Sequence, residues 1–443
     1  MGYRGKRKPL PDEPVAAHIE SFAHDGRGIA HVDGRVVFVD GALPGEDVTF
    51  VYTEIKRDYA AGRAEEIVTA SPDRVPPRCR HFALCGGCSL QYLSEDAQIA
   101  LKEDLLLEQF RRIGKVEPAA QFPPLRGPHW GYRSRARLGA RYVAKKGREL
   151  VGFREHSSAK IVDMTDCPVL HPALGERIEA FAELIEGLSL RERLPQIEAA
   201  VGEERTALVF RVLEDPTPKD FARLAQFGED HGLDVYIQRE GRDSVAPVYP
   251  ETAHDLSYSL PEWDLIFRFG PLDFTQVNMA INRQMIGRVM QVLDPQPDDR
   301  VLDLFCGLGN FTLPLARRAA YVTGVEGGGE AVARAIRNAA DNGIGNVEFH
   351  LADLSKPENC GAWAGREYDK VLLDPSRAGA LEILQCVPKW KAGRIVYVSC
   401  NPSTLARDAG VLVHEHGYRL LQAGVMDMFP HTAHVESIAL FER

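Results

Sequence analysis

Two rhythms of apolar and polar residues run along this chain. In the first part, short alternating runs such as residues 36–40 (VVFVD) and 48–52 (VTFVY) are separated by a glycine-containing turn. A period of two is typical of strands that bury one face. From about residue 271, longer apolar runs end in small or polar residues, and helical stretches separate most of them. This second rhythm predicts a doubly wound parallel sheet.

These rhythms predict a multidomain protein with both all-β and α/β parts. Residues 1–70 predict a small β-barrel of the oligonucleotide-binding type, and the prolines of SPDRVPPRC then break the chain. Residues 71–270 predict a central domain that mixes strands and helices, with one helix over residues 94–113. Residues 271–443 predict a Rossmann-like domain.

Composition narrows the class of protein. The chain has 443 residues, of which 44% are hydrophobic and 26% charged, as in ordinary globular proteins. No apolar run reaches the length of a membrane-spanning helix. The basic N-terminal stretch lacks the apolar core of a secretory signal. These features predict a cytoplasmic protein that does not bind membranes.

Charge is distributed unevenly. The net charge of −10 argues against a protein that coats nucleic acid without specificity. Residues 126–160, however, hold ten Lys and Arg against two Glu. Arg133, Arg135 and Arg137 alternate there, so a strand would place them on one face. A solvated strand face would explain this pattern, but in an acidic chain it favours a polyanion as the partner.

Residues 301–316 (VLDLFCGLGNFTLPLA) contain an apolar run that leads into a glycine loop. Gly307 and Gly309 allow the backbone to approach a ligand closely. In an open α/β sheet, ligands lie outside the carboxyl ends of the strands. Thr312 stands where a dinucleotide-binding loop has its third glycine. Such a loop could also serve chain packing alone.

Acidic residues close the next two predicted strands. Glu326 is placed to accept hydrogen bonds from both ribose hydroxyls of an adenosine. Asp353 can meet an adenine amino group. Packing would explain the glycines but not both acids, so the pattern favours S-adenosylmethionine over NAD.

The stretch YVSCNPSTLARD places Cys400 at the tip of a predicted buried strand. Ser403 is a candidate N-cap for the helix that follows, and the dipole of that helix would favour a thiolate. A thiolate that adds to carbon 6 of a pyrimidine makes carbon 5 able to attack a methyl sulfonium. Asp374, at another strand tip, is placed to hydrogen-bond the base.

Cysteines also gather near the predicted barrel. Cys79, Cys85 and Cys88 are closely spaced, and Cys167 is a remote fourth. Thiolates bind zinc and iron–sulfur clusters alike, so spacing leaves the metal open. The compact C-x3-C-x2-C pattern of radical enzymes is absent from the sequence. We expect the other cysteines to be small buried side chains: Cys306, Cys360 and Cys386.

Five motifs together resemble the uracil-5 RNA methyltransferases. They are FTQVN (274–278), DLFCGLGNFTLPLA (303–316), LLDPSRAG (372–379), VSCNPSTLARD (398–408) and MFPHTAHVES (428–437). The resemblance covers almost the whole chain and is greatest to the type that modifies 23S rRNA. HDGRGIA and ALPGE resemble a TRAM domain, an RNA-binding β-barrel. CRHFALCGGCSLQ resembles the [4Fe-4S] site of that type.

The resemblance implies a role for each matching residue. Cys400 would be the nucleophile, and Glu436 would be the base that removes the proton from carbon 5. The cofactor S-adenosylmethionine would be bound by Gln276, Phe305, Gly307, Gly309, Asn310, Glu326, Asp353 and Asp374. A structural [4Fe-4S] cluster would be held by Cys79, Cys85, Cys88 and Cys167.

The resemblance also implies the substrate, a uridine flipped out of a single-stranded loop of 23S rRNA by a monomeric enzyme. Two alternatives stay open. A cytosine-5 RNA methyltransferase usually has a Pro-Cys nucleophile, whereas the order here is Cys-Asn-Pro. A non-catalytic RNA-binding or ribosome-assembly factor would have no need of nucleophile, base and cofactor loop together.

Overall fold

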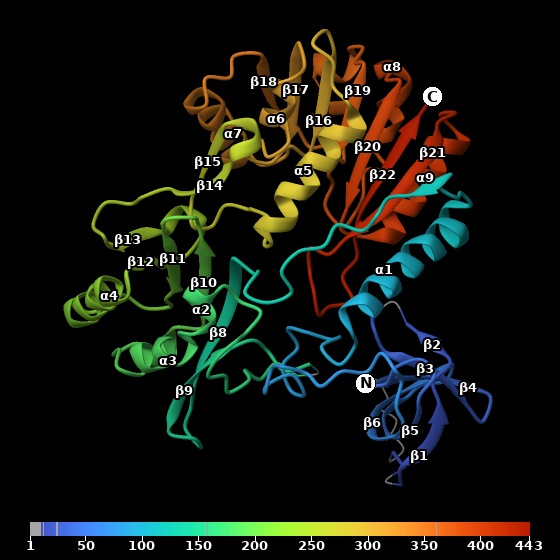
Figure 1. The fold of residues 1–443 in the computed structure, drawn as a ribbon. Coiled ribbons are helices and arrows are strands. Elements are labelled where there is room, and N and C mark those ends of the chain that lie inside the picture. The colour runs from blue at the N-terminus through green and yellow to red at the C-terminus, as the bar shows by residue number, and fades with distance from the viewer. Residues whose placement is uncertain (1–9, 12, 24, 157, 360) are drawn as a thin grey trace, which may run out of the picture. The chain divides into compact units, whose positions relative to one another are not determined.

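The structure is a computed structural model that describes the chain except for residues 1–9, 12, 24, 157 and 360. The chain divides into two compact units (Figure 1). The first unit contains Met1–Phe82, Cys88–Leu105 and Pro430–His434, and the second contains Ala83–Gly87, Leu106–Phe429 and Val435–Arg443. A short segment from near the C-terminus therefore belongs to the unit that contains the N-terminal strands.

A six-stranded sheet builds most of the first unit, in the order β1-β5-β6-β4-β3-β2. Along β4, the buried residues Val37 and Val39 alternate with more exposed neighbours, and they share a core with Phe50. The strands are Val15–His18 (β1), Ser21–Phe22 (β2), Gly28–Val32 (β3), Arg35–Asp40 (β4), Asp47–Ile55 (β5) and Tyr59–Thr69 (β6).

The strands predicted at residues 36–40 and 48–52 are present but are not neighbours. β4 pairs with β3 and, in parallel, with β6, whereas β5 pairs with β1 and β6. The turn between them therefore does not close a hairpin. Pairing of this kind depends on contacts between distant segments, which alternation does not record.

The helix predicted over residues 94–113 is present as α1, Glu95–Gln109, and continues as one turn of π-helix, Phe110–Gly114. The π-turn packs on α9, Pro402–His414. A Cβ atom on Gly114 would lie 2.4 Å from the carbonyl oxygen of Ala406, so only glycine permits this approach. The helix that follows Cys400 is thereby held from one side.

The central sheet of the second unit has the order β13-β12-β11-β10-β8-β9. Helix α4 packs on this sheet. Its N-cap residue is Thr217, and the side chains of Thr217 and Asp220 each accept a hydrogen bond from the other residue's backbone N–H group. Its C-cap residue is Gly232, which has a φ of 63°. The strands are Arg135–Val143 (β8), Arg148–Gly152 (β9), Gln196–Val201 (β10), Thr206–Arg211 (β11), Asp234–Gln238 (β12) and Ala246–Tyr249 (β13). The helices are Pro172–Gly175 (α2), Ile178–Glu186 (α3) and Pro218–His231 (α4), with 3-10 turns at Arg191–Arg193 and Arg242–Ser244.

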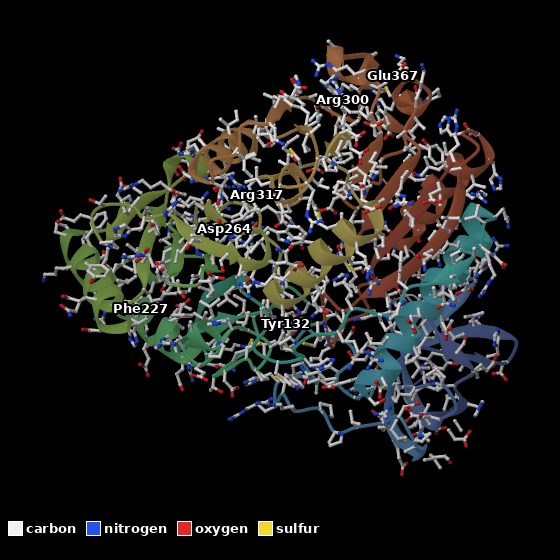
Figure 2. The ribbon with its side chains drawn as sticks, turned by 45° about the horizontal axis from the view of Figure 1, so that its top comes forward. Tyr132, Phe227, Asp264, Arg300, Arg317 and Glu367 are labelled. Atoms are coloured by element: carbon white, nitrogen blue, oxygen red, sulfur yellow. The ribbon has the colours of Figure 1, made fainter. Side chains whose placement is uncertain are left out.

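A hairpin of Leu256–Leu260 (β14) and Leu265–Phe269 (β15), joined by a 3-10 turn at Pro261–Trp263, lies between the central sheet and the C-terminal sheet in the sequence. Arg317 donates hydrogen bonds to the carbonyl oxygens of Trp263 at 3.2 Å and Asp264 at 2.9 Å. Figure 2 shows Arg317 and Asp264 close together. The hairpin is thus fastened to the C-terminal sheet and its helices.

An eight-stranded sheet forms the C-terminal part, in the order β18-β17-β16-β19-β20-β22-β21-β7. The strands from β18 to β20 are parallel, as predicted, and β22 runs antiparallel between β20 and β21. The strands are Ala120–Gln121 (β7), Arg300–Leu304 (β16), Tyr321–Glu326 (β17), Val347–Leu351 (β18), Lys370–Leu373 (β19), Arg394–Ser399 (β20), Arg419–Met426 (β21) and Glu436–Glu442 (β22).

Helices connect these strands, and α5 packs against β20 (Figure 1). β20 is buried and apolar over most of its length, as a strand covered on both faces requires. The helices are Met279–Leu293 (α5), Thr312–Ala316 (α6), Gly329–Asp341 (α7), Val387–Trp390 (α8) and α9, with 3-10 turns at Pro357–Asn359, Ala362–Gly365 and Ile383–Cys386. Of the helices described, none combines the length and the apolar character that a membrane span requires.

Candidate active site

The carboxyl ends of β16, β17, β19 and β20 meet at one edge of the eight-stranded sheet. The chain runs outward from β16 to β18 and then returns to the other side of β16 as β19. An open α/β sheet binds its ligands where the strand order reverses in this way. The glycine loop follows β16, Asp374 follows β19 and Cys400 follows β20. The topology therefore brings these predicted site residues to one edge.

The loop after β16 has an unusual backbone. Phe305, Gly307 and Gly309 have positive φ angles of 65°, 56° and 94°. A Cβ atom on Gly307 would meet no other atom within 4 Å, so the backbone conformation, rather than crowding, favours glycine there. The N–H groups of Phe305 and Cys306 both donate to the carbonyl oxygen of Val325, which fixes the loop to β17.

Glu326 ends β17 beneath this loop. Its Oε2 atom accepts a hydrogen bond from the N–H of Gly307 at 3.1 Å, and its Oε1 atom accepts one from Gly328 at 2.9 Å. The carboxylate therefore lies directly against the glycine loop. This is where a residue that binds the ribose of an adenosine is expected.

Asp353, after β18, makes its contacts within its own turn. Its Oδ1 atom accepts a hydrogen bond from the hydroxyl of Ser355 at 2.6 Å, and its Oδ2 atom lies 3.0 Å from Nζ of Lys356. The bond from Ser355 and the charge of Lys356 lower the pKa of Asp353 to about 2. Its side chain is about half exposed at the end of the strand.

The side chain of Asn310 is bonded behind the loop. It exchanges two hydrogen bonds with the amide of Asn282 in α5, at 2.9 and 3.2 Å, and accepts a third from the hydroxyl of Tyr258 in β14 at 2.8 Å. The sequence does not single out Asn282 or Tyr258, because each contacts Asn310 only once folding has brought these distant residues together. Gln276 lies in the loop before α5, near the N-cap residue Asn278.

A buried acid beneath the loop was not singled out in the sequence. Asp303 is fully buried in β16, and its Oδ2 atom accepts a hydrogen bond from the hydroxyl of Thr312 at 2.5 Å. Among the described residues, no hydrogen-bond partner reaches its Oδ1 atom. Burial raises the pKa of Asp303 to about 7, and the charges of Asp374 and Glu326 add to this effect. Asp303 could have been found in the sequence from its position at the start of the glycine-loop motif, residues 303–316.

β20 and β22 bring Cys400 and Glu436 together. Ser399 faces Ser437 in the antiparallel register, so the residues that continue the two strands, Cys400 and Glu436, are adjacent. Glu436 is 4% exposed, whereas Cys400 is partly exposed. Burial raises the pKa of Glu436 to about 7, and the positive charge of Arg377 opposes this rise. Glu436 can thus exchange a proton near neutral pH.

The surroundings of Cys400 do not favour the thiolate. Burial raises the pKa of the Cys400 thiol to about 11, with further contributions from the charges of Glu436 and Asp374, while Arg377 opposes them. Burial and the same neighbouring acid, Glu436, raise the pKa of Asp374 well above its ordinary value. The sequence predicts that a helix dipole favours the thiolate, whereas burial and the two acids act against it.

The prediction that Ser403 caps α9 is wrong. Asn401 is the N-cap residue, and its Oδ1 atom accepts a hydrogen bond from the N–H of Ser403 at 3.1 Å. Pro402 is the first residue of the helix, a position that suits its fixed φ and missing N–H group. Asn401 is among the best N-cap residues. The helix therefore begins closer to Cys400 than the sequence suggested.

The arginine stripe is less open than the sequence suggested. Arg137 is exposed, but it forms an ion pair with Glu198 at 3.0 Å. Arg133 donates to the carbonyl oxygen of Arg135, and Arg135 donates to that of Pro271 at 3.0 Å. Burial lowers the pKa of Arg135 to about 10. Two of the three arginines are therefore half-buried and bonded within the protein.

The cysteines predicted to hold a cluster are divided between the units. Cys79 and Cys88 belong to the first unit, and Cys85 and Cys167 belong to the second. Thiolates are suitable donors for iron. Within the part of the chain that the structure describes, however, no three His, Cys, Asp or Glu side chains are arranged to hold a metal ion. The [4Fe-4S] prediction is therefore not confirmed.

The sequence predicts that the remaining cysteines are small buried side chains. Cys306 and Cys386 are buried, as expected. Burial raises the pKa of both thiols. Cys360 lies outside the described residues.

Comparison with known proteins decides the family. Residues 132–443 match the sequence profile described as tRNA (Uracil-5-)-methyltransferase. Over 443 residues the chain is 92% identical to the 23S rRNA (uracil(1939)-C(5))-methyltransferase RlmD of Methylococcus capsulatus, with 100% of both chains covered. The chain belongs to the uracil-5 methyltransferase family. A family member of the same name from Alkalilimnicola ehrlichii is 52% identical over 100% of this chain and 99% of that protein.

A solved structure of the family has the same fold. It is the tRNA (uracil-54, C5)-methyltransferase of Pyrococcus abyssi in complex with S-adenosyl-L-homocysteine, with a TM-score of 0.74 and 26% identity over 96% of this chain and 100% of that chain. Residues 15–64 match the TRAM domain. The predictions of a TRAM domain, of a methyltransferase fold and of the uracil-5 methyltransferase family are confirmed. The roles of individual site residues stay predictions.

Proposed function

We propose that this uracil-5 methyltransferase transfers a methyl group from S-adenosylmethionine to carbon 5 of a uracil in 23S rRNA. One observation carries the proposal: a cysteine and a buried acid with a pKa near 7 are adjacent at the edge of the sheet that bears the glycine loop. The full-length relatives are named for uracil 1939. We propose the same nucleotide for this chain.

S-adenosylmethionine would supply the methyl group in electrophilic form on a sulfonium. The backbone of the glycine loop would lie against it, and Glu326 would accept hydrogen bonds from the ribose hydroxyls. This orientation would point the methyl group toward Cys400 and the target base. The proposed binding residues are Gln276, Phe305, Gly307, Gly309, Asn310, Glu326, Asp353 and Asp374.

Cys400 begins the proposed reaction. Its thiol, which is partly exposed, would release its proton to solvent. The sulfur would then add to carbon 6 of the uracil, which moves an electron pair onto carbon 5 and the neighbouring carbonyl oxygen. Burial raises the pKa of Asp374, which favours its protonated form. A protonated Asp374 can donate a hydrogen bond to that oxygen as negative charge develops. Carbon 5 would then bond to the methyl carbon. The bond between that carbon and the sulfonium sulfur of S-adenosylmethionine would break, which would release S-adenosylhomocysteine.

Glu436 completes the proposed reaction. Its carboxylate removes the proton from carbon 5, and the released electron pair restores the ring double bond and expels the sulfur of Cys400 from carbon 6. A base with a pKa of about 7 is largely ionised at slightly alkaline pH and still accepts a proton effectively. The protonated Glu436 then returns its proton to solvent.

Phe274 is the proposed stacking surface for RNA. Its ring is 76% exposed in the loop just before α5, although it is large and apolar. Exposed aromatic rings stack on unpaired bases, and a uridine must leave its stack before its carbon 6 can reach a thiol. We propose that Phe274 supports the loop that surrounds the flipped uridine, and that the TRAM domain and Arg137 contact phosphates.

Several finer features belong to the same proposal. Cys79, Cys85, Cys88 and Cys167 would hold a structural [4Fe-4S] cluster, supported by their spacing and by the chemistry of thiolates. Residues 1–70, 71–270 and 271–443 would form the three domains. The protein would act as a monomer in the cytoplasm, where its rRNA substrate is made.

The decisive experiment uses 23S rRNA fragments in which 5-fluorouridine replaces uridine. A base can remove a proton from carbon 5 but cannot remove fluorine in the same way. The covalent adduct should therefore survive on a denaturing gel after methyl transfer. Cys400→Ala should abolish the shifted band, whereas Cys386→Ala, which alters a buried thiol outside the site, should keep it. Mapping the crosslink would identify the nucleotide.

Other outcomes would favour the alternatives. Absence of an adduct from folded protein with bound cofactor would favour a non-catalytic RNA-binding or assembly factor. Appearance of 5-methylcytidine in unmodified RNA would favour a cytosine-5 methyltransferase.

A further inference from the structure

The loop that carries Asp374 and Arg377 is tied to the helix that follows Cys400. The carbonyl oxygen of Arg377 accepts hydrogen bonds from Nδ2 of Asn401 at 3.0 Å and from the hydroxyl of Thr404 at 3.3 Å. The next carbonyl oxygen along this loop, that of Ala378, accepts one from Nη2 of Arg407 at 2.9 Å. Three side chains of the helix region thus hold two successive loop carbonyls.

Asp408 lies at the centre of this arrangement and is fully buried. Its Oδ2 atom accepts hydrogen bonds from the hydroxyl of Tyr397 at 2.6 Å and from the N–H of Ala380 at 2.7 Å. Its Oδ1 atom accepts one from Nε of Arg407 at 2.8 Å. A buried carboxylate is tolerated only when it is paired and hydrogen-bonded, and such charge-assisted bonds are strong. One side chain therefore joins β20, α9 and the loop after β19.

Gly379 allows the loop to come this close. It has a φ of 82°, and a Cβ atom there would lie 2.5 Å from Nη2 of Arg407 and 2.7 Å from Oδ2 of Asp408. Its N–H group donates to the carbonyl oxygen of Ser376 at 2.9 Å, which closes the turn. The backbone of the loop and the carboxylate of Asp408 therefore fit only with glycine at this position.

The position of the loop matters because its charge acts on the reacting groups. The positive charge of Arg377 opposes the rise in the pKa of both Cys400 and Glu436. Asp374, at the start of the same loop, acts in the opposite direction on Cys400. Electrostatic effects at such short range change strongly with small displacements. A loop free to shift would alter the charge balance at the thiol.

We propose that Asp408 is a positioning residue for methyl transfer, which, with Tyr397 and Arg407, holds residues 374–380 in a fixed place beside Cys400. This inference deepens the proposed function and rests on it. Asp408 does not touch the substrate. It acts through the loop, so that Asp374 and Arg377 meet the base and the sulfur in one geometry throughout the reaction.

Two variants test the proposal with one matched control. Asp408→Asn keeps the size of the side chain but removes its charge and half of its acceptors. Tyr397→Phe keeps the packed ring and removes one hydrogen bond. The control is Asp220→Asn in α4, because Asp220 is also buried and accepts hydrogen bonds from Ser189 and Thr217, outside the site described above.

The first measurement is the pH dependence of Cys400 alkylation by iodoacetamide in the RNA-free protein, read by mass spectrometry. Asp408→Asn and, to a smaller extent, Tyr397→Phe should move the alkylation profile to higher pH, because Arg377 is no longer held near the sulfur. Asp220→Asn should lower the melting temperature but keep the wild-type profile. A purely structural role for Asp408 would lower stability without moving the profile.

The second measurement is methylation of 23S rRNA fragments. Asp408→Asn should lower kcat on the order of a hundredfold, as displacements near 1 Å do, with unchanged affinity for S-adenosylmethionine. Wild-type profiles and kcat in both variants would overturn the proposal, and Tyr397→Phe decides it if Asp408→Asn does not fold. If the wild-type protein forms no RNA adduct, the proposed function fails, while the alkylation profiles still judge the positioning role.

Discussion

Glu436 influences the proposed reaction twice, as the base and as a charge beside the nucleophile. Its pKa of about 7 lets it accept the proton from carbon 5, yet its negative charge raises the pKa of the Cys400 thiol. Two adjacent acidic groups cannot both ionise without mutual repulsion. The thiol is therefore easiest to ionise when Glu436 is protonated, and Arg377 offsets part of this conflict.

The charge balance at Cys400 predicts two shifts of opposite sign. Glu436→Gln removes a negative charge, so alkylation of Cys400 by iodoacetamide should proceed at lower pH than in the wild type. Arg377→Gln removes a positive charge, so alkylation should require higher pH. The measurement is the alkylation rate between pH 6 and about 11, within the range set by the Cys400 pKa. Shifts in the same direction for both variants would contradict this account.

The same residue predicts the pH dependence of catalysis. Proton removal from carbon 5 needs ionised Glu436, so single-turnover release of methylated RNA should rise as the pH passes through about 7. Glu436→Gln should accumulate the covalent adduct with ordinary uridine RNA. Stopped reactions on denaturing gels measure both. Release at the wild-type rate from Glu436→Gln would exclude Glu436 as the base.

Glu149 predicts a change in stability that is independent of the active site. It is fully buried in β9, and both carboxylate oxygens lack a hydrogen-bond partner among the described residues. Burial raises its pKa from 4.5 to about 8, and Glu186 adds to the effect. The folded state then holds a proton that the unfolded state releases, so the free energy of unfolding should fall as pH rises from about 4.5 to about 8.

The test is Glu149→Gln. The variant should match the wild-type melting temperature near pH 5 and exceed it near pH 8, because the amide cannot ionise. Methylation activity should be unchanged. A wild-type advantage at pH 8 would show that Glu149 is stabilising as a carboxylate.

At the scale of secondary-structure elements, β22 contributes most to the site. It enters the sheet antiparallel between β20 and β21, which places its first residue, Glu436, beside the tip of β20. A parallel strand in that place would present its opposite end to Cys400. The orientation of one strand therefore pairs the base with the nucleophile.

The start of α9 predicts a difference between two helix caps. Asn401→Ala and Thr217→Ala each remove an N-cap side chain, and each should lower the free energy of unfolding by about 1 kcal/mol. Asn401 also donates a hydrogen bond to the carbonyl oxygen of Arg377, next to the site. Thr217 instead caps α4, which packs against β12 and β13 of the central sheet. Denaturant unfolding and initial methylation rates measure the two effects. Only Asn401→Ala should slow methylation, and equal rates would show that the α9 cap is merely structural.

At the scale of the whole molecule, the iron–sulfur proposal predicts a metal-dependent fold. Anaerobically purified protein should contain iron and acid-labile sulfide in equal amounts, and chelation should lower the melting temperature. The Cys79→Ser variant should lose the iron and the acid-labile sulfide, whereas the Cys386→Ser variant should keep them. Zinc without sulfide would replace the proposal with a zinc site. Methylation that required a reductant at every turnover would show that the cluster is not purely structural.

Much of this protein follows from the sequence because its information is local. Alternation in residues 36–40, apolar runs after residue 271 and the spacing of Gly307 and Gly309 each depend on neighbours along the chain. Strand order then follows from general rules for α/β folds, which bring the carboxyl ends of the strands to one edge. Local pattern and these rules were sufficient for the parallel sheet, its glycine loop and the acids after the next two strands, whereas Gln276, Phe305, Asn310 and Glu436 were taken from the resemblance to the uracil-5 RNA methyltransferases.

Other properties depend on which distant segments meet. The register of β20 with β22, the bonds of Asn310 to Asn282 and Tyr258, and the hold of Asp408 on residues 374–380 each join residues far apart in the sequence. The proton balance at Cys400 is of the same kind, since it depends on burial and on charges brought near by folding. Desolvation and electrostatic energies depend on distance in space, so only the tertiary structure could decide them.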